Sequence, residues 1–231
     1  MSEQITQSER YFDLIANIYD NATKSKNTWN PPSLIYDNIK KYISNNSILL
    51  DIGIGTGQSS AQIYKNEIYK NLYGVDISQK MIEECKKKYP NIFLKQISSI
   101  NEILNLSVDK FDIIIASGLI EFIKDIELFF SIIGSIIQEN GYFVFTYEPI
   151  IEFHPYQQYK SSLTVPNKDS SVYIEDFYTY RYTPLDMKKY LEQFNFSIIN
   201  EIEFIAYEKG SEKIIYHLFL VTKNHINHHL N

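Results

Sequence analysis

Short runs of uninterrupted apolar residues alternate along this chain with stretches in which apolar positions recur at helical spacing. Continuous apolar runs rich in β-branched and aromatic residues are typical of strands that are covered on both faces of a sheet. Three runs fit this pattern: Ser47 to Leu50, Asp112 to Ala116 and Tyr142 to Thr146. They predict central parallel strands.

Helices are predicted between these strands, where apolar residues recur every three or four positions. The predicted helices are Ser59 to Asn71, Ser78 to Lys88 and Ile126 to Gln138. We expect the Asn140-Gly141 pair to close the last of them, because glycine adopts the left-handed conformation at a helix end at low cost. The alternation of strands and helices implies right-handed crossovers and a parallel sheet.

Different patterns flank this unit. Residues 5 to 44 favour two helices, which Pro31 and Pro32 separate because proline breaks one helix and can begin the next. Downstream, Pro184 to Phe194 is predicted as a helix. Phe196 to Ala206 and Ile214 to Val221 are predicted as the strands of an antiparallel hairpin at the sheet edge.

The length of 231 residues suits a single domain, 1–231, better than two domains with separate cores. The patterns divide it into an N-terminal helical cap (1–46), a central core (47–148), an insertion (149–182), a terminal helix and hairpin (183–223) and a tail (224–231). Hydrophobic residues make up 44% and charged residues 22%, which is typical of chains that fold.

Charge and composition exclude several classes of function. The formal net charge of -6 provides no positive field for phosphate backbones, so nucleic acid is not an expected partner. The first residues lack the basic segment and apolar run of a secretory signal, and the most apolar window, Leu128 to Ile137, is shorter than the ~18 residues of a membrane span. Cys85 is the single cysteine, which excludes an intrachain disulfide and a multi-cysteine zinc site. We therefore expect a cytoplasmic protein without membrane contact.

The strongest chemical signal is DIGIGTG, Asp51 to Gly57, placed between a predicted strand and a predicted helix. Glycines there let the backbone turn sharply and approach a ligand with no Cβ in the way. The next strand ends at Asp76, where a carboxylate can accept hydrogen bonds from ribose hydroxyls. The glycine spacing is G-x-G-x-G, whereas the dinucleotide fingerprint G-x-G-x-x-G would place its third glycine at Gln58.

These features resemble the class I S-adenosylmethionine-dependent methyltransferases, whose first motif runs hydrophobic-hydrophobic-Asp-x-Gly-x-Gly-x-Gly and whose second ends in Asp. The resemblance continues through Phe111 to Asp125 and Glu139 to Glu148, and covers residues 47 to 148. It implies a Rossmann-like, doubly wound α/β fold with a mostly parallel seven-stranded sheet, an antiparallel hairpin at one edge and N-terminal helices. It also implies S-adenosyl-L-methionine as cofactor and S-adenosyl-L-homocysteine as product.

The resemblance assigns a cofactor-binding set by position: Tyr19, Asp51, Gly53, Gly55, Gly57, Asp76, Ile77, Met81, Ser98, Ser117 and Gly118. Ile77 and Met81 would flank the adenine, and Ser117 and Gly118 would pass beside the methionine part. Tyr19 belongs to a Tyr-Asp pair that would close over the cofactor carboxylate.

Some of these positions have a structural alternative. Asp51 could cap the turn by bonding backbone amides, as short acidic side chains commonly do. Tyr19 and Trp29 could simply anchor N-terminal helices to the core. After the third strand the family often carries an acidic residue near the adenine amine, whereas this chain reads Gln96-Ile97-Ser98-Ser99, which leaves Ser98 at that contact.

The insertion at residues 149–182 interrupts the regular alternation and is predicted to form a substrate-covering lid, because long loops on this side of a sheet are usually functional. It contains six tyrosines: Tyr156, Tyr159, Tyr173, Tyr178, Tyr180 and Tyr182. The predicted substrate-binding residues are Trp29, Tyr156, Tyr178, Tyr180 and Arg181, of which Arg181 would hold an acceptor carboxylate. Alternatively, the alternating tyrosines mark a plain edge strand and Arg181 a surface ion pair.

Two residues after the fifth strand are candidates for catalysis. His154 is a candidate general base, because histidine side chains ordinarily titrate near neutrality. Glu148 lies just past the carboxyl end of a strand, where open α/β sheets bind ligands. No metal site is expected, because the histidines at 225, 228 and 229 fall in the tail without a second cluster of ligands. Alignment of an activated methyl donor can supply ~7–11 kcal/mol of a barrier, so a base is not essential.

The predicted function is methyl transfer from S-adenosylmethionine to oxygen, nitrogen or carbon of a small-molecule acceptor by in-line displacement. Ser117-Gly118-Leu119-Ile120 stands where amino-methylating nucleic-acid enzymes carry an Asn/Asp-Pro-Pro-aromatic signature, which excludes that class. Two alternatives stay open: a noncatalytic cofactor-binding regulatory or scaffold protein, and an NAD-dependent oxidoreductase, which the glycine spacing disfavours.

Overall fold

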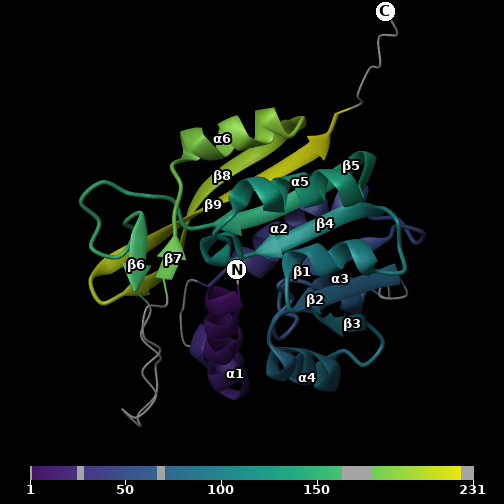
Figure 1. The fold of residues 1–231 in the computed structure, drawn as a ribbon, viewed down its shortest axis with the longest axis horizontal. Helices are drawn as coiled ribbons and strands as arrows, with labels where there is room; N and C mark the ends of the chain where they lie inside the picture. The colour runs from purple at the N-terminus through teal and green to yellow at the C-terminus, as the bar shows by residue number, and fades with distance from the viewer. Residues whose placement is uncertain (1, 25–28, 67–70, 163–177, 225–231) are drawn as a thin grey trace, which may run out of the picture.

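The computed structural model describes residues 2–24, 29–66, 71–162 and 178–224 (Figure 1). Within them the helices are α1 (Ser2–Lys24), α2 (Pro31–Ile39), α3 (Ala61–Lys65), α4 (Gln79–Lys88), α5 (Ile126–Ile136) and α6 (Pro184–Gln193). Single turns of 3-10 helix occur at η1 (Lys40–Tyr42) and η4 (Ile120–Phe122), and a longer one at η3 (Ile100–Asn105). None of the helices in these ranges is long and apolar enough to cross a membrane.

The strands form one seven-stranded sheet and one small hairpin. The sheet contains β1 (Leu49–Ile52), β2 (Leu72–Asp76), β3 (Phe93–Gln96), β4 (Phe111–Ser117), β5 (Ile137–Tyr147), β8 (Phe196–Lys209) and β9 (Glu212–Lys223), in the order β3-β2-β1-β4-β5-β9-β8. Strands β1 to β5 are parallel, and the β8–β9 hairpin joins them antiparallel through β9. The predicted fold class, including the hairpin at one edge, is therefore confirmed.

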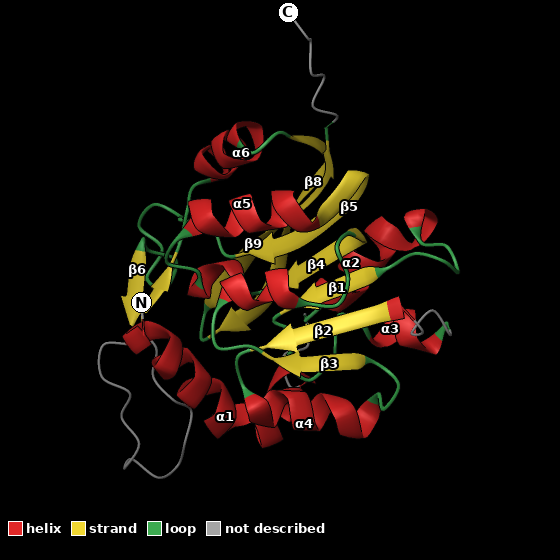
Figure 2. Cartoon of the chain, turned by 45° about the vertical axis from the view of Figure 1, so that its right-hand side comes forward, coloured by secondary structure: helices red, strands yellow, loops and turns green. Residues whose placement is uncertain are grey.

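Burial on both faces explains why the central strands are apolar without interruption. Leu50, Ile114 and Phe143 pack on one face with α5 and α6, whereas their neighbours Leu49 and Ile113 pack on the other with α2, α3 and α4. Consecutive residues of a strand point to opposite faces, so every position of such a strand must be apolar. Figure 2 shows helices on both sides of the sheet.

The predicted end of the helix that begins at Ile126 is wrong. The helix predicted from Ile126 to Gln138 ends at Ile136, because Ile137 already pairs with Phe111 in the sheet. Asn140, with a φ of 59°, takes the left-handed conformation inside β5, so the Asn-Gly pair does not cap a helix. Gly141 is needed for space instead, since a Cβ there would lie 2.8 Å from Ile137 Cγ1.

The helix predicted from Ser59 to Asn71 is also shorter than expected. Among the described residues 59–66, α3 (Ala61–Lys65) is helical, and residues 58–60 form turns. Residues 67–70 of the predicted helix lie outside the described part of the chain.

The carboxyl ends of the parallel strands face two further elements. α1 packs on α4 through Ile15, Ala16 and Met81, and both views show the two helices side by side (Figures 1 and 2). The second element is the small hairpin of β6 (Lys160–Ser162) and β7 (Tyr178–Tyr180), which belongs to the predicted lid. Figure 2 shows the arrowheads of β2 and β3 pointing to the side where α1 begins. Residues 163–177 of the predicted lid, with Tyr173, lie outside the described residues.

Gln157 attaches the segment after β5 to the sheet. β5 ends at Tyr147, opposite His217, so β9 has no strand partner on that side at Ile215. The Gln157 amide takes the place of that strand: its Oε1 accepts from Ile215 N at 2.9 Å, and its Nε2 donates to Ile215 O at 2.8 Å. The side chain is fully buried, so these bonds satisfy backbone groups that water cannot reach.

We expect Gln157→Ala to lower the free energy of unfolding by about 1–3 kcal/mol, because it leaves a buried amide and carbonyl of Ile215 without partners. Gln158→Ala is the matched control, since that neighbouring side chain is exposed and bonds only loop carbonyls; it should change stability by less than about 0.5 kcal/mol. Urea unfolding followed by circular dichroism measures both. Equal effects of the two substitutions would contradict this role for Gln157.

Candidate functional site

A cavity of about 1100 Å³ opens at the carboxyl ends of the parallel strands. Its walls come from α1, from the loops after β1, β2, β3 and β4, from the first turn of α5, and from β7 and α6. Open parallel sheets bind ligands at this edge. The cavity is therefore the candidate site. A predicted site residue that contacts a ligand there must line this cavity.

The glycine loop forms the floor of the cavity at Gly53 and Gly55. The loop is held by Gly53 N and Ile54 N, which donate to Val75 O at 2.8 and 3.0 Å. Both glycines have positive φ, 69° and 53°. A Cβ on Gly55 would have no atom nearer than Gly53 O at 3.9 Å, so the missing side chain leaves room for a ligand.

Gly57 serves packing rather than the cavity. A Cβ there would lie 2.8 Å from the Tyr89 ring and 2.9 Å from Cys85 Sγ. Gly57 also does not line the cavity, although the motif places it among the cofactor-binding residues. The motif therefore combines glycines with two different functions, ligand approach and close packing.

The two acids of the motif strands occupy different positions. Asp76 lines the cavity, and its carboxylate accepts from Gly55 N at 2.8 Å and Ser78 N at 2.9 Å. Burial raises the pKa of Asp76 to about 6, although both amide bonds lower it. Asp51 does not line the cavity and accepts from Ser60 Oγ at 2.6 Å, a side-chain hydroxyl rather than the backbone amides of the structural alternative.

The helix α1 covers the glycine loop and is attached to it by carboxylates. Asp20 accepts from Thr56 Oγ1 at 2.6 Å and Gln58 Nε2 at 2.9 Å, and pairs with Lys88 Nζ at 2.7 Å. Tyr19, the residue before Asp20, lines the cavity, and so does Phe12, about two turns earlier. Tyr19 thus lies where the sequence places it, whereas the attachment by Asp20 was not predicted.

The loops after β2, β3 and β4 complete the inner half of the cavity. Ile77, Met81, Ser117 and Gly118, which belong to the predicted cofactor-binding set, line it. Gly118 has a φ of 59°, and a Cβ there would meet only Tyr216 Oη, at 4.0 Å. After the third strand Ser99 lines the cavity, whereas the predicted Ser98 does not.

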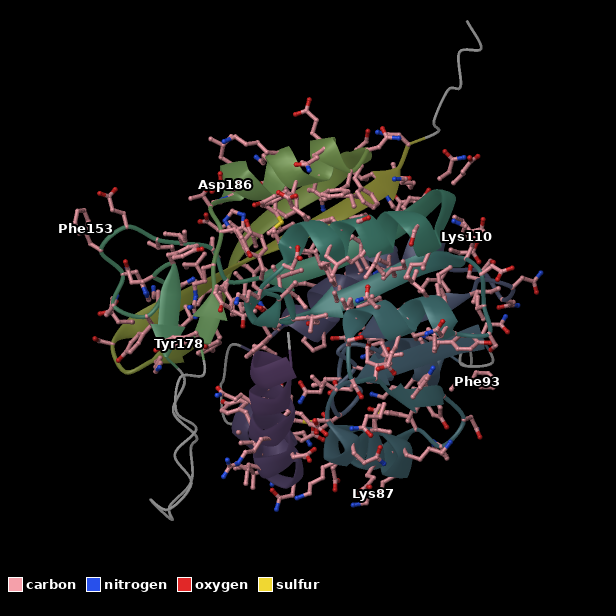
Figure 3. The ribbon with its side chains drawn as sticks, viewed as in Figure 1. Lys87, Phe93, Lys110, Phe153, Tyr178 and Asp186 are labelled. Carbon is pink, nitrogen blue, oxygen red and sulfur yellow. The ribbon has the colours of Figure 1, made fainter. Side chains whose placement is uncertain are left out.

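Tyrosines form the outer half of the cavity. They are Tyr159, Tyr178, Tyr180, Tyr182 and Tyr190, which we call the tyrosine wall. Figure 3 labels Tyr178 on the small hairpin, and Phe153 on the outlying loop, where it is 92% exposed. Tyr178 and Tyr180 belong to the predicted substrate-binding set and line the cavity, whereas Tyr190 belongs to α6, outside the predicted lid.

Arg181 and Glu148 form a buried ion pair behind the tyrosine wall. Arg181 Nε donates to Glu148 Oε2 at 2.8 Å, Nη2 contacts the same oxygen, and Nη1 donates to Thr179 Oγ1 at 2.9 Å. The hydroxyls of Tyr207 and Tyr216 donate to Glu148 Oε1 at 3.2 and 3.3 Å. Both charged groups are thus committed to each other, and neither lines the cavity.

Glu121 adds a second buried carboxyl to this network. Its Oε1 accepts from Glu148 N, whereas its Oε2 has no partner. Burial and the neighbouring Glu148 raise the pKa of Glu121, and Arg181 lowers it by a smaller amount. Glu121 was not predicted, and nothing in the local sequence distinguishes it from an exposed glutamate of a turn.

The remaining predicted residues lie outside the cavity lining. His154 Nδ1 accepts from Tyr156 N and Gln157 N, at 3.2 and 3.1 Å, so its ring organises the loop. The Tyr156 ring carries Lys209 Nζ at 4.0 Å from its centre. Trp29 donates to Gln58 Oε1 at 2.9 Å and packs against Tyr207 and Tyr216. Their positions do not support direct contact with a ligand in this cavity.

The described residues contain no group of three or more His, Cys, Asp or Glu side chains that could hold a metal ion. The inner cavity instead presents backbone, a carboxylate and apolar side chains. The space above Gly55 and Gly118 and the carboxylate of Asp76 fit a nucleoside with a polar extension, because the carboxylate can accept from ribose hydroxyls.

Comparisons with known proteins agree with this geometry. A family model described as a methyltransferase domain matches residues 50–145. No sequence among the curated proteins matches the chain significantly.

Three solved structures show the same fold at low identity. A Clostridium acetobutylicum S-adenosylmethionine-dependent methyltransferase is 18% identical, with 93% of this chain and 99% of that chain covered, at a TM-score of 0.62. A chain of the Haloferax volcanii complex between a methyltransferase activator and a methyltransferase is 12% identical, with 96% and 99% covered, at 0.72. Magnesium protoporphyrin IX methyltransferase from Synechocystis PCC 6803, solved with bound S-adenosylmethionine, is 14% identical, with 96% and 97% covered, at 0.64.

The structural likenesses establish the fold, and the family match covers the glycine loop, Asp76 and the end of β4. The cofactor of this family is S-adenosylmethionine, so the nicotinamide alternative is set aside. Residues 50–145 thus match a methyltransferase domain, within a fold that the chain shares with S-adenosylmethionine-dependent methyltransferases.

Proposed function

We propose that this protein transfers the methyl group of S-adenosylmethionine to oxygen, nitrogen or carbon of a small molecule that binds beside it in the same cavity. The observation that carries the proposal is the division of the cavity, with a glycine floor and Asp76 in its inner half and the tyrosine wall in its outer half. One cavity can thus bring donor and acceptor together. Action in the cytoplasm stays a prediction from the sequence.

The inner half provides the cofactor contacts in this proposal. Asp76 accepts from the ribose hydroxyls, and Ile77 and Met81 flank the adenine. Gly55 lets the backbone approach the ligand, and Gly118 leaves room at the methionine end. These roles are supported by the lining of the cavity and by the open space at both glycines.

The chemistry requires alignment more than acid–base groups. The sulfonium of the cofactor supplies a methyl group that is already activated. Among the described residues that line the cavity there is no histidine, and His154 and Glu148 lie outside the lining. The proposed contribution of the protein is therefore to hold the acceptor atom in line with the methyl carbon, which can supply ~7–11 kcal/mol of a barrier.

The decisive experiment incubates the protein with S-adenosylmethionine carrying a deuterated methyl group and pools of small metabolites. We expect mass spectrometry to find one metabolite that gains the labelled methyl, together with S-adenosylhomocysteine. Cofactor binding without transfer to any pool would favour the noncatalytic alternative.

We expect Gly55→Val to weaken S-adenosylmethionine binding by at least about tenfold, because a branched side chain at this position fills the space that the ligand needs. Gly210→Val is a matched control: Gly210 also has a positive φ, 65°, with no atom within 4 Å of a Cβ, but lies in the β8–β9 turn. Both variants carry the same backbone strain, so only the first should lose affinity in calorimetric titration. Equal affinities of the two variants would place the cofactor elsewhere.

We also expect cofactor affinity to fall as the pH is lowered. The carboxylate of Asp76 must be ionised to accept two ribose hydrogen bonds, and its pKa is raised to about 6. Below that pH the dissociation constant should rise by up to about tenfold per pH unit. Calorimetry between pH 7 and pH 5 measures this.

Asp76→Asn should remove that pH dependence and weaken binding at pH 7 by about 1.5–3 kcal/mol, the usual contribution of hydrogen bonds to a charged group. Asp51→Asn is the control, because Asp51 has a pKa raised to about 7 but does not line the cavity; this variant should keep the response to pH. A pH dependence that survives Asp76→Asn would contradict the ribose assignment.

A further inference from the structure

The tyrosine wall is built from side chains of three separate segments that face one space. Tyr159 precedes β6, Tyr178 and Tyr180 share one face of β7, and Tyr182 and Tyr190 belong to the start and body of the α6 region. The intervening Thr179 is buried on the opposite face with Arg181. The pairing of β7 with β6 and the buried ion pair thus orient the tyrosines toward the cavity.

Several tyrosines of the wall are neighbours in space. The rings of Tyr182 and Tyr190 meet edge to face, with centres 6.0 Å apart, and Tyr182 Oη donates to Ile123 O at 3.4 Å. Burial raises the pKa of Tyr182, and the neighbouring hydroxyls of Tyr190, Tyr159 and Tyr180 raise it further. Several phenol oxygens and ring faces therefore border one region of the cavity.

The charges around this region are mostly negative. Apart from Asp76 in the inner half, the described lining contains two carboxylates, Asp125 and Glu127, against the single ammonium group of Lys124, and no arginine. Arg181, which could have held an acceptor carboxylate, is committed to Glu148 instead. An anionic acceptor would meet repulsion from the acids, whereas a cation would be attracted to them and to the tyrosine ring faces.

We propose that the acceptor is a small-molecule amine, which the tyrosine wall together with Asp125 and Glu127 recognises in its cationic form. This inference rests on the proposed function and selects nitrogen among the three acceptor atoms. Cation–π attraction to tyrosine rings and hydrogen bonds from the ammonium to phenol and carboxylate oxygens hold the ligand.

The reaction balances without a dedicated base. The ammonium first releases one proton to solvent, and the nitrogen lone pair then forms the new N–C bond as the S–C bond breaks. The electron pair of the broken bond stays on sulfur, giving S-adenosylhomocysteine and a methylated ammonium. Amines lose this proton readily compared with aliphatic hydroxyls or carbon acids, which agrees with a described lining that contains no histidine.

Three probes of similar shape and different charge test the recognition: 2-phenylethylamine, 3-phenylpropionate and 2-phenylethanol. Each is titrated calorimetrically at pH 7 into the protein saturated with S-adenosylhomocysteine. We expect the amine to bind at least about tenfold more tightly than the carboxylate, with the alcohol between them. Binding of the carboxylate or the alcohol as tight as that of the amine, or no measurable binding of the amine, would overturn the inference.

Variants of Tyr180 test whether the tyrosine wall binds the amine. Tyr180→Leu should weaken amine binding by roughly two- to fivefold, the range for one cation–π contact, and Tyr180→Phe, which keeps the ring, should retain most of the affinity. Tyr156→Leu is the matched control, since that tyrosine lies outside the lining with Lys209 over its ring; it should bind the amine like the unmodified protein. Equal losses in Tyr180→Leu and Tyr156→Leu would refute recognition by the wall.

The S-adenosylhomocysteine titration separates this inference from the proposed function. If the unmodified protein fails to bind S-adenosylhomocysteine, the proposed function itself fails. If it binds that molecule with no preference for the amine, only the assignment of the acceptor class is overturned.

Discussion

The hydrogen bond from Gly55 N to the Asp76 carboxylate is the interaction on which the site depends. It joins the loop after β1 to the end of β2 at 2.8 Å, while Val75 O holds the preceding two amides of the same loop. Asp76 thereby fixes the backbone that forms the cavity floor and still presents its carboxylate to the cavity. Burial raises the pKa of Asp76. It also strengthens the hydrogen bonds that the carboxylate can accept from ligand hydroxyls, because the local dielectric constant is low.

Two charged contacts also hold elements around the cavity together, one near the surface and one in the interior. Asp20 connects α1 to the glycine loop near the surface, where solvent and Lys88 share the carboxylate. Arg181 and Glu148 connect the small hairpin to the end of β5 in a dry interior. A surface contact of the first kind can open at low cost, whereas separation of a buried ion pair leaves uncompensated charge. The side of the cavity under α1 is thus held more loosely than the tyrosine wall, where we propose that the acceptor binds.

Local sequence was sufficient to predict the features that depend on residues close together in the chain. The buried strands follow from continuous apolar runs, and Gly53, Gly55 and Asp76 follow from a motif whose spacing reflects one turn. The same motif could not show that Gly57 avoids a clash with Tyr89, because that contact arises from the return of the chain in α4. The error at Ile137 has the same origin, since pairing with Phe111 overrides a helical pattern.

Contacts between distant segments could not be read from the sequence. Asp20 and Thr56 are 36 residues apart, and Arg181 and Glu148 are 33 apart, so no periodicity connects them. The sequence identified Arg181, Glu148 and His154 as chemically capable residues, but their partners decide what they do. Arg181 and Glu148 neutralise each other, and His154 organises its own loop.

The alternation along β7 separates anchoring from recognition within a few residues. Thr179 and Arg181 point to the interior and hold the strand, whereas Tyr178 and Tyr180 face the cavity. Substitutions at the second pair can change the shape and polarity of the wall while the anchors, the sheet and the glycine loop stay as they are. With such an arrangement, selection on single wall positions could change which acceptors fit, while the glycine loop and Asp76 at the other end of the cavity stay the same.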